Sequence, residues 1–246
     1  MDGDTPRVGL ATDARMLFAD ATGVATYARA LHAALTKIDP ALTLIADAST
    51  WGKPSRVIEK WSRWMRTSDV RTRVLRAVQR NQHRCFYRAD LFRLSQVHFN
   101  RHNSLMKVFA PGPPGIVHWS YPIPIHLQGW ANIYTVHDAI PLTHPNLTPI
   151  DPIRYRRLMR EIAAHAARIV TVSDHAAGEI IAQFECTPDL VANCGLAVEP
   201  PRQQSSGVLP EGLSSGQYFL FIGTIEPRKN LIGVAHAYAA SAVKMP

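Results

Sequence analysis

The sequence predicts an α/β domain built on a parallel sheet, and three observations favour this fold class. Short apolar runs that fit strands alternate with longer segments of helical periodicity, an order typical of parallel strands joined by crossover helices. Several of the strand candidates end in polar residues and prolines. The chain has 246 residues, 46% hydrophobic and 19% charged, which is enough for one large or two small packed domains and argues against intrinsic disorder.

The first predicted unit has the order strand, helix, strand. Residues 7–14 read as a short buried strand, and the helix after them carries an apolar stripe that includes Val24 and Leu35. Residues 21–23 (Ala-Thr-Gly) form a turn-prone entry into this helix. Residues 42–46 complete the β-α-β pattern.

The middle of the chain continues the pattern after a basic, helix-prone stretch at residues 51–104 and a Pro-Gly turn at residues 111–115. Further strands are predicted at residues 116–120, 133–136, 168–172 and 190–192. A helix is predicted from about Asp151, with Pro152 favourable at its first position, and Ser173 can cap the next one.

The composition changes near residue 198 and predicts a domain boundary. Residues 1–197 form the first domain in this prediction, and residues 198–217 have the Pro, Gln, Ser and Gly content of a linker. Residues 218–246 hold one strand (218–224) and one helix (230–240), the start of a second, incomplete Rossmann-like domain. One strand and one helix bury too little surface to be a domain alone.

Cysteines and hydropathy exclude several classes of protein. Cys85, Cys186 and Cys194 are odd in number and lack CxxC spacing, so neither a disulfide framework nor a zinc knuckle is indicated, and a reducing cytoplasm fits best. No apolar run reaches the roughly 20 residues that a membrane span needs. The first seven residues do not resemble a signal peptide.

The densest cluster of reactive side chains follows the strand predicted at residues 133–136. His137 and Asp138 come directly after it, where open α/β sheets place ligand sites, so we predict that they are catalytic. Two alternatives stay open. In one, His137 only bonds backbone carbonyls and Asp138 caps a turn. The other is a metal site that adds His118 and His144, although no HExxH spacing supports it.

A second cluster, residues 221–230, combines a strand, a glycine turn and two cations, Arg228 and Lys229, at the start of a helix. A helix N-terminus presents free amides and a partial positive charge, and both cations would add to its attraction for a phosphate or diphosphate. The motif is not a Walker loop, because GxxxxGK[ST] is absent. A solvated Arg-Lys pair at a turn is the alternative.

The net charge of +8 is concentrated in one segment. Residues 51–110 contain 14 basic and 3 acidic side chains, whereas the remainder contains 13 basic and 16 acidic ones. Within residues 56–67, apolar side chains recur at helical spacing opposite cations, a pattern typical of a helix on an anionic membrane surface. The predicted membrane contacts are Arg56, Lys60, Trp61, Arg63, Trp64 and Arg66. A core-facing stripe is the alternative, and no nucleic-acid-binding signature accompanies the charge.

Several motifs stand in a fixed order between residues 7 and 240. They are residues 13–15 (Asp-Ala-Arg), 22–23 (Thr-Gly), 135–138 (Thr-Val-His-Asp), Pro141, 144–145 (His-Pro), 168–173 (Arg-Ile-Val-Thr-Val-Ser) and 223–231 (Gly-Thr-Ile-Glu-Pro-Arg-Lys-Asn-Leu). In order and spacing they resemble the family 4 glycosyltransferases, retaining enzymes of the GT-B fold, and especially the mannosyltransferase-like members of bacterial polysaccharide assembly.

The resemblance implies that an N-terminal Rossmann-like domain holds the acceptor, that a C-terminal one holds the nucleotide sugar, and that reaction occurs in the cleft between them. It places His137 beside the reacting sugar and Gly23 in an acceptor-side loop. It assigns Gly223, Arg228 and Lys229 to the donor diphosphate, where a cation stabilises the charge on the leaving group. No metal or other cofactor is implied. The substrate that the resemblance implies is GDP-mannose or a UDP-sugar.

The resemblance also implies transfer of a hexose, with mannose favoured, to a lipid-linked or polysaccharide acceptor. This acceptor and the basic segment indicate a cytoplasmic protein, peripheral at the inner face of the cytoplasmic membrane, with no nucleic-acid partner. Thr224 departs from the second diphosphate-binding arginine of many relatives, and the Glu-x7-Glu donor region is not in the sequence. We therefore expect weak or no transferase activity. A non-catalytic remnant, or a module that binds an acceptor or partner, is the alternative.

Overall fold

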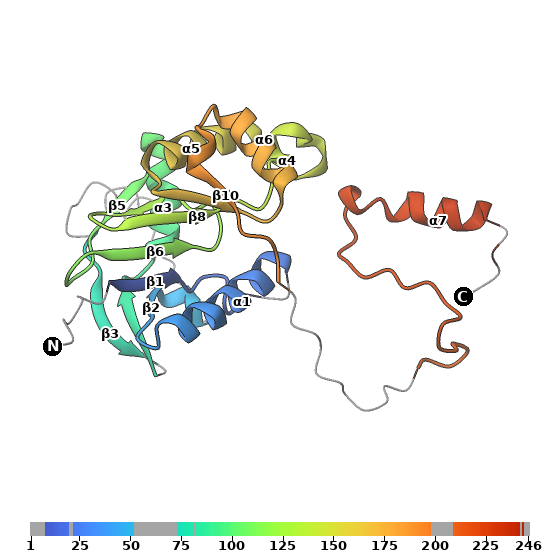
Figure 1. Ribbon diagram of the computed structural model, residues 1–246, viewed down its shortest axis with the longest axis horizontal. Coiled ribbons are helices and arrows are strands. Elements are labelled where there is room, and N and C mark those ends of the chain that lie inside the picture. The colour runs from blue at the N-terminus through green and yellow to red at the C-terminus, as the bar shows by residue number, and fades with distance from the viewer. Residues whose placement is uncertain are drawn as a thin grey trace.

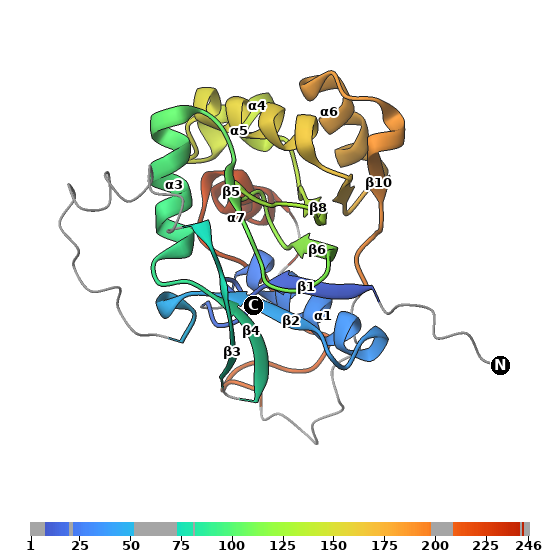
Figure 2. The same cartoon turned by 90° about the vertical axis from the view of Figure 1, so that its left-hand side faces the viewer.

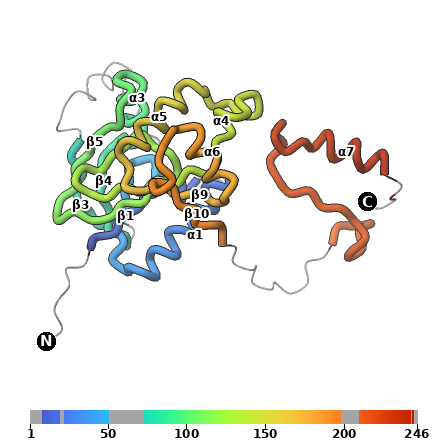
Figure 3. Tube along the Cα trace, turned by 45° about the horizontal axis from the view of Figure 1, so that its top comes forward, coloured from blue at the N-terminus to red at the C-terminus, as the bar shows by residue number. Residues whose placement is uncertain are grey.

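The computed structural model describes residues 8–19, 22–51, 73–80, 82–197, 209–241 and 243. Residues 8–197 contain a sheet domain, and the described residues 209–241 and 243 belong to a C-terminal segment that lies apart from it (Figures 1 and 3). Of the predicted linker, residues 198–217, only 209–217 belong to the described part of the chain.

Eight strands make one sheet in the order β10-β9-β8-β6-β1-β2-β4-β3. Their bounds are β1 (Gly9–Asp13), β2 (Thr43–Ala46), β3 (Arg76–Arg80), β4 (His83–Tyr87), β6 (Gly115–Trp119), β8 (Ala131–Thr135), β9 (Arg168–Thr171) and β10 (Val191–Asn193). Neighbouring strands are parallel except for the antiparallel pair β3 and β4. Two further strands, β5 (Met106–Val108) and β7 (Ile125–Leu127), pair in parallel. The predicted fold class, α/β with a mostly parallel sheet, is confirmed.

Polar side chains start three of the helices in the sheet domain. The described helices are α1 (Gly23–Ile38), α3 (Leu91–His102), α4 (Ile140–Thr143), α5 (Pro152–His165), α6 (Asp174–Phe184) and α7 (Leu231–Ala240). Thr22, Asp151 and Ser173 each accept a hydrogen bond from a backbone amide in the first turn of α1, α5 and α6, respectively. Among the described residues, no helix combines the length and the hydropathy needed to cross a bilayer.

Helices cover both faces of the sheet, and strand alternation decides which residues meet them. In β2, Leu44 and Ala46 pack with Ala28 of α1 on one face, while Ile45 joins the larger cluster that includes Phe99 of α3 on the other. The larger cluster also takes apolar residues of α5 and α6. Figure 2 shows α1 and α3 on opposite sides of the strands. The core is therefore a three-layer arrangement with the sheet in the middle.

Residues 51–104, whose sequence is helix-prone, supply the strands β3 and β4 as well as the helix α3, and these two strands were not predicted. These strands have few apolar residues, so an alternation of apolar and polar residues does not stand out in the sequence. Nevertheless, Cys85 and Phe86 of β4 point to opposite faces of the sheet, where Phe86 packs in the larger cluster and Cys85 in the smaller one. The helix predicted over residues 56–67, with its membrane contacts, lies outside the described residues.

The strand predicted at residues 218–224 does not form in the described structure. Phe219, Leu220 and Ile222 are 63%, 69% and 83% exposed. A strand is stabilised by backbone hydrogen bonds to a neighbour, and this segment lies apart from the sheet (Figure 1). The helix predicted after it is confirmed as α7, although none of its residues is buried.

Gly115 is expected to be essential for the pairing of β1 with β6. A Cβ atom at this position would lie 2.1 Å from the backbone oxygen of Gly9, so Gly115→Ala forces the two strands apart. We expect this variant to lose at least about 2 kcal/mol of unfolding free energy in urea denaturation. Gly23→Ala is the control, since no atom lies within 4 Å of its Cβ position and alanine favours the helix. Equal urea midpoints for the two variants would contradict the prediction.

Candidate active site

Ser120 joins the carboxyl ends of three parallel strands. It follows β6, and its backbone N–H and hydroxyl donate hydrogen bonds of 2.5 and 3.0 Å to the two carboxylate oxygens of Asp13, the last residue of β1. Its carbonyl oxygen accepts a hydrogen bond of 3.1 Å from Nε2 of His137, which follows β8. The sequence predicts polar residues at these strand ends, and the sheet order brings them together.

Asp13 is a buried carboxyl group, 1% exposed, at the centre of this arrangement. Burial raises its pKa to about 6, and the two hydrogen bonds from Ser120 only partly offset this effect. The nearby Arg15 also favours the ionised form. Asp13 therefore changes its protonation state close to neutral pH, unlike an exposed aspartate.

His137 is half-buried, and one of its ring nitrogens is committed. A backbone carbonyl only accepts, so Nε2 carries the proton, and in the neutral ring Nδ1 retains a lone pair. Burial lowers the pKa of His137, and the Ser120 carbonyl and Asp138 offset part of this shift. The ring of Tyr27, from α1, meets the His137 ring edge-on with centroids 4.8 Å apart. His137 is thus a neutral, oriented hydrogen-bond acceptor.

Thr135 links the start of α1 to the end of β8. Its hydroxyl lies 2.8 Å from Nε2 of His118 and 3.0 Å from the hydroxyl of Tyr27. Having one proton, it can donate to one of these groups and accept from the other. Burial lowers the pKa of His118 to about 4, so this histidine stays neutral at neutral pH. The network fixes Tyr27, and through it the ring of His137.

Asp138 stabilises the turn after β8. One carboxylate oxygen accepts a hydrogen bond of 3.1 Å from the backbone N–H of Ile140 in α4, and its backbone oxygen accepts one of 3.2 Å from the Tyr155 hydroxyl. These are contacts that the structural-turn interpretation predicts for Asp138.

The metal interpretation finds no support in the described part of the chain. No three histidine, cysteine or acidic side chains there are arranged to share a metal ion. His118 faces Thr135, His137 faces Ser120, and His144 is exposed with its Nδ1 beside the Thr143 hydroxyl. Each candidate ligand is turned toward a different neighbour.

Two residues at the same edge were missed by the sequence analysis, Asp47 after β2 and Tyr121 after Ser120. Asp47 is 2% exposed and accepts a hydrogen bond of 3.1 Å from the backbone N–H of Phe92 in the first turn of α3. The buried Tyr121 hydroxyl has its pKa raised by burial, with Arg15 close by. Asp47 is the first residue after β2, and Tyr121 is the second after β6, as His137 is after β8, so the rule that selects His137 could have selected them.

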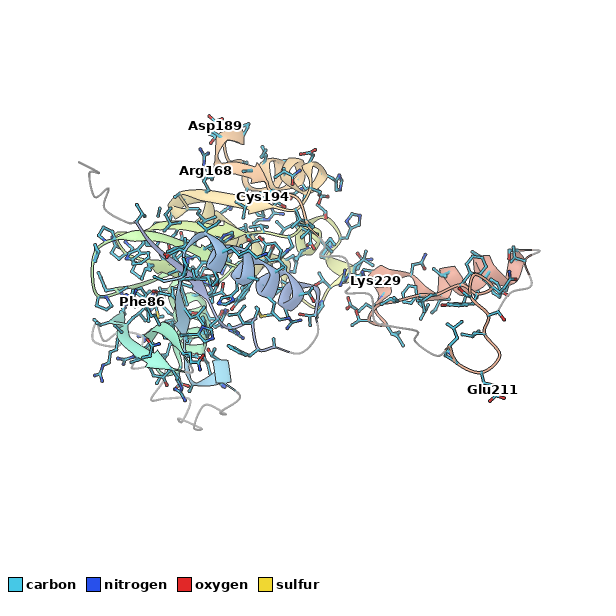
Figure 4. All side chains as sticks on the ribbon, turned by 60° about the horizontal axis from the view of Figure 1, so that its bottom comes forward. Phe86, Arg168, Asp189, Cys194, Glu211 and Lys229 are labelled. Atoms are coloured by element: carbon cyan, nitrogen blue, oxygen red, sulfur yellow. The ribbon has the colours of Figure 1, made fainter. Side chains whose placement is uncertain are left out.

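Gly23 and the cationic motif stand in different parts of the structure. Gly23 is the exposed first residue of α1, at the edge where Tyr27 meets His137. Gly223, Arg228 and Lys229 belong to the C-terminal segment and are exposed; Figure 4 shows Lys229 there. The structure therefore does not bring the predicted diphosphate-binding residues to His137.

Arg228 has a local partner in this segment. Its Nε lies 2.6 Å from a carboxylate oxygen of Glu226, whose other oxygen accepts a hydrogen bond from the Thr224 hydroxyl. These two hydrogen bonds lower the pKa of Glu226. The motif thus contains its own anion, which an incoming diphosphate would have to replace.

Comparison with known proteins gives one informative similarity. O-antigen chain mannosyltransferase B of Escherichia coli is 36% identical to this chain over 113 residues, which cover 43% of this chain. The match spans 30% of that protein's length. No family model matches the chain. No solved structure matches it either.

Asp13 is expected to make stability fall as the pH rises. Its pKa is about 6 in the folded chain and 3.8 in the reference state, so the folded form binds more protons between these values. This shift corresponds to about 3 kcal/mol of unfolding free energy that is present below pH 4 and lost above pH 6. The stability difference between wild type and Asp13→Asn, measured in urea at several pH values, should change by this order. Asp189→Asn, at an exposed position, is the control. An identical pH profile for Asp13→Asn and wild type would contradict the prediction.

The Thr135 network predicts a graded loss of stability. Tyr27→Phe removes one hydrogen bond but keeps the ring against His137, so we expect a loss of about 1 kcal/mol. Thr135→Val leaves both Tyr27 and His118 without this partner and should cost about 2–3 kcal/mol. Urea unfolding of both variants tests the order. A smaller loss for Thr135→Val than for Tyr27→Phe would rule out the network as described.

Proposed function

We propose that this chain is the acceptor-side part of a retaining glycosyltransferase with the GT-B arrangement of family 4. The proposed reaction moves a hexose, with mannose favoured, from GDP-mannose or a UDP-sugar to a lipid-linked or glycan acceptor. The similarity to O-antigen chain mannosyltransferase B carries the proposal. The cluster at the carboxyl edge of the sheet supports it, because α/β enzymes bind ligands there.

In this proposal His137 positions the reacting sugar. Its neutral ring offers Nδ1 as an acceptor for a sugar hydroxyl, while Ser120 and Tyr27 fix the ring plane. A charged imidazolium could not accept this bond, so the burial that lowers the pKa of His137 serves the role. Asp138 holds the turn that carries His137, and Gly23, the first residue of α1, borders the proposed acceptor-side loop.

The leaving group in the proposed reaction is a nucleoside diphosphate, and negative charge grows on it in the transition state. Lys229 is exposed, and the side chain that holds Arg228 among the described residues is Glu226, on the surface, so both cations can turn to a diphosphate at Gly223. The exposed ion pair with Glu226 offers little resistance to such an exchange. The proposal uses these two cations and no metal ion. It requires the C-terminal segment to meet the sheet edge during reaction.

The proposed acceptor fits a place at the inner face of the cytoplasmic membrane. The charge excess of residues 51–110 supports attraction to anionic lipids, and such attraction would bring the chain to a lipid-linked glycan. Membrane association and the cytoplasmic side are parts of the proposal.

The test is transfer of radiolabelled hexose from GDP-mannose or a UDP-sugar to membrane glycolipids, with the chain in stoichiometric excess so that weak turnover registers. We expect weak transfer by the wild type and a transfer rate at least about 100-fold lower in His137→Ala, because this variant lacks the imidazole nitrogen that would accept a hydrogen bond from the sugar. His144→Ala is the matched control, since this exposed histidine lies outside the cluster, and it should keep full transfer.

Absence of transfer from every nucleotide sugar would contradict a catalytic role for this chain. Binding of separately labelled acceptor glycolipid by the wild type, lost in His137→Ala, would instead favour the acceptor-binding module. Equal transfer by the His137→Ala and His144→Ala variants would remove His137 from the proposed mechanism.

A further inference from the structure

A cavity of about 530 Å³ lies at the amino edge of the sheet, on the side away from His137. α3 starts beside Asp47 at the carboxyl edge of the sheet. α5 ends at the opposite edge, because the backbone N–H of Ala167, two residues after this helix, donates a hydrogen bond to the backbone oxygen of Asn132 near the amino end of β8. The last turns of α3 and α5 therefore reach the opposite edge. Together with β5 they line the cavity, and Figure 2 shows these three elements next to one another.

We call this cavity the histidine pocket. The charged and imidazole side chains that line it are Arg73, His98, His102, Lys107, Glu161 and His165. Its volume lies within the range of small-molecule sites, roughly 300–1,000 Å³. It shares no residue with the cluster around Ser120, so it is a second site.

The pocket is cationic beyond what the two helices require. Arg101, His102 and His165 stand in the last turns of α3 and α5, where positive charge offsets the negative end of the helix dipole. Arg73 and Lys107 belong to neither helix and add two full charges. Within the described part of the lining, Glu161 is the one acidic side chain.

The positive charges around the pocket lower the pKa of two histidines. Burial, then Arg73 and His102, lower the pKa of His98 to about 4. His126, on β7 with its ring 5.8 Å from that of His165, has its pKa lowered by burial, then by His165 and Lys107. Cations thus act on both rings from several elements.

His98 also has an unsatisfied polar atom. The side chain is 5% exposed, and Nδ1 has no hydrogen-bond partner among the described residues, while Nε2 lies 3.4 Å from the Ser104 hydroxyl. A buried polar atom without a partner is costly and uncommon. A bound ligand with acceptor oxygens would give a protonated Nδ1 its partner.

We propose that the histidine pocket binds a phosphate-bearing ligand, of the size of a diphosphate or a sugar phosphate, through Arg73, Lys107 and the paired rings of His98 and His102. The two rings lie on consecutive turns of α3 with centroids 4.6 Å apart, so one multivalent anion can meet both. The site is separate from the proposed transfer reaction. A lipid headgroup and a free phosphate compound offer the same chemistry to it.

Binding at this site takes up protons. In the empty pocket the neighbouring cations disfavour the protonated form of the imidazole rings, whereas a bound anion favours it. The affinity for the anion therefore rises as the pH falls. The groups that face these rings are Arg73, Arg101, His102, Lys107, His126, Glu161 and His165. Glu161 is the one acid in this set.

The experiment is calorimetric titration of the wild-type chain with inorganic pyrophosphate at neutral pH. Lys107→Gln and Arg73→Gln should each weaken binding about tenfold, because each removes a full charge from the pocket. Lys107 is exposed, so its variant is expected to fold normally. Lys37→Gln, in the last turn of α1, is the matched control and should bind like the wild type.

Lys229→Gln separates this site from the proposed donor site and should leave pyrophosphate binding in the pocket unchanged. If Lys229→Gln alone loses pyrophosphate binding, the assignment of the phosphate site to the histidine pocket is wrong, while the proposed function is unaffected. No binding by the wild type, or equal affinity for Lys107→Gln and Lys37→Gln, would also overturn this assignment.

Sulfate, whose charge is constant in this range, tests the proton uptake, with binding expected to be several-fold tighter at about pH 5.5 than at about pH 8. Affinity that does not change with pH would refute the part assigned to the histidines.

Vesicles of phosphatidylglycerol or phosphatidylcholine identify the source of the phosphate. Binding to the anionic vesicles that pyrophosphate displaces supports a headgroup, and pyrophosphate binding without vesicle binding supports a free compound. If Lys107→Gln still binds the vesicles when pyrophosphate is present, the proposal that the pocket binds a lipid headgroup is wrong.

Discussion

The hydrogen bonds of Ser120 hold together the edge of the sheet on which the candidate chemistry depends. Its amide and hydroxyl are bound to the carboxylate of Asp13, and its carbonyl accepts from His137, so one residue ties β1, β6 and β8 at their carboxyl ends. A change in any of the three strands would move the other two. Because the His137 bond uses a backbone oxygen, the position of the ring depends on the strand itself rather than on a replaceable side chain.

The two edges of the sheet have different electrostatic character. At the carboxyl edge, burial keeps His118 and His137 neutral, and the carboxyl group of Asp13 is only weakly acidic. At the amino edge, Arg73 and Lys107 line the same pocket as His98. Polar groups that bind by geometry and cations that attract anions thus stand at opposite edges of the sheet.

Local sequence signals predicted much of the fold and part of the candidate site. Ser173 and Asp151 mark helix starts through side-chain chemistry that acts within three residues, and β8 ends at Thr135, one residue before the end of the predicted strand. The helix-prone sequence of residues 51–104 did not indicate β3 and β4, because these strands depend on pairing with each other and with β2. The histidine pocket could not be predicted, because Arg73, His98 and His165 meet only after the chain has folded.

Residues 218–224 failed to form the predicted strand for want of a neighbour, and that failure affects the behaviour of the molecule in solution. This window contains aromatic and β-branched residues, no charge and no proline, and Phe219, Leu220 and Ile222 face solvent. Such a composition favours intermolecular β-pairing. The strand propensity of this segment is therefore available for pairing between molecules, and a surface that covered the segment would favour the colloidal stability of the chain.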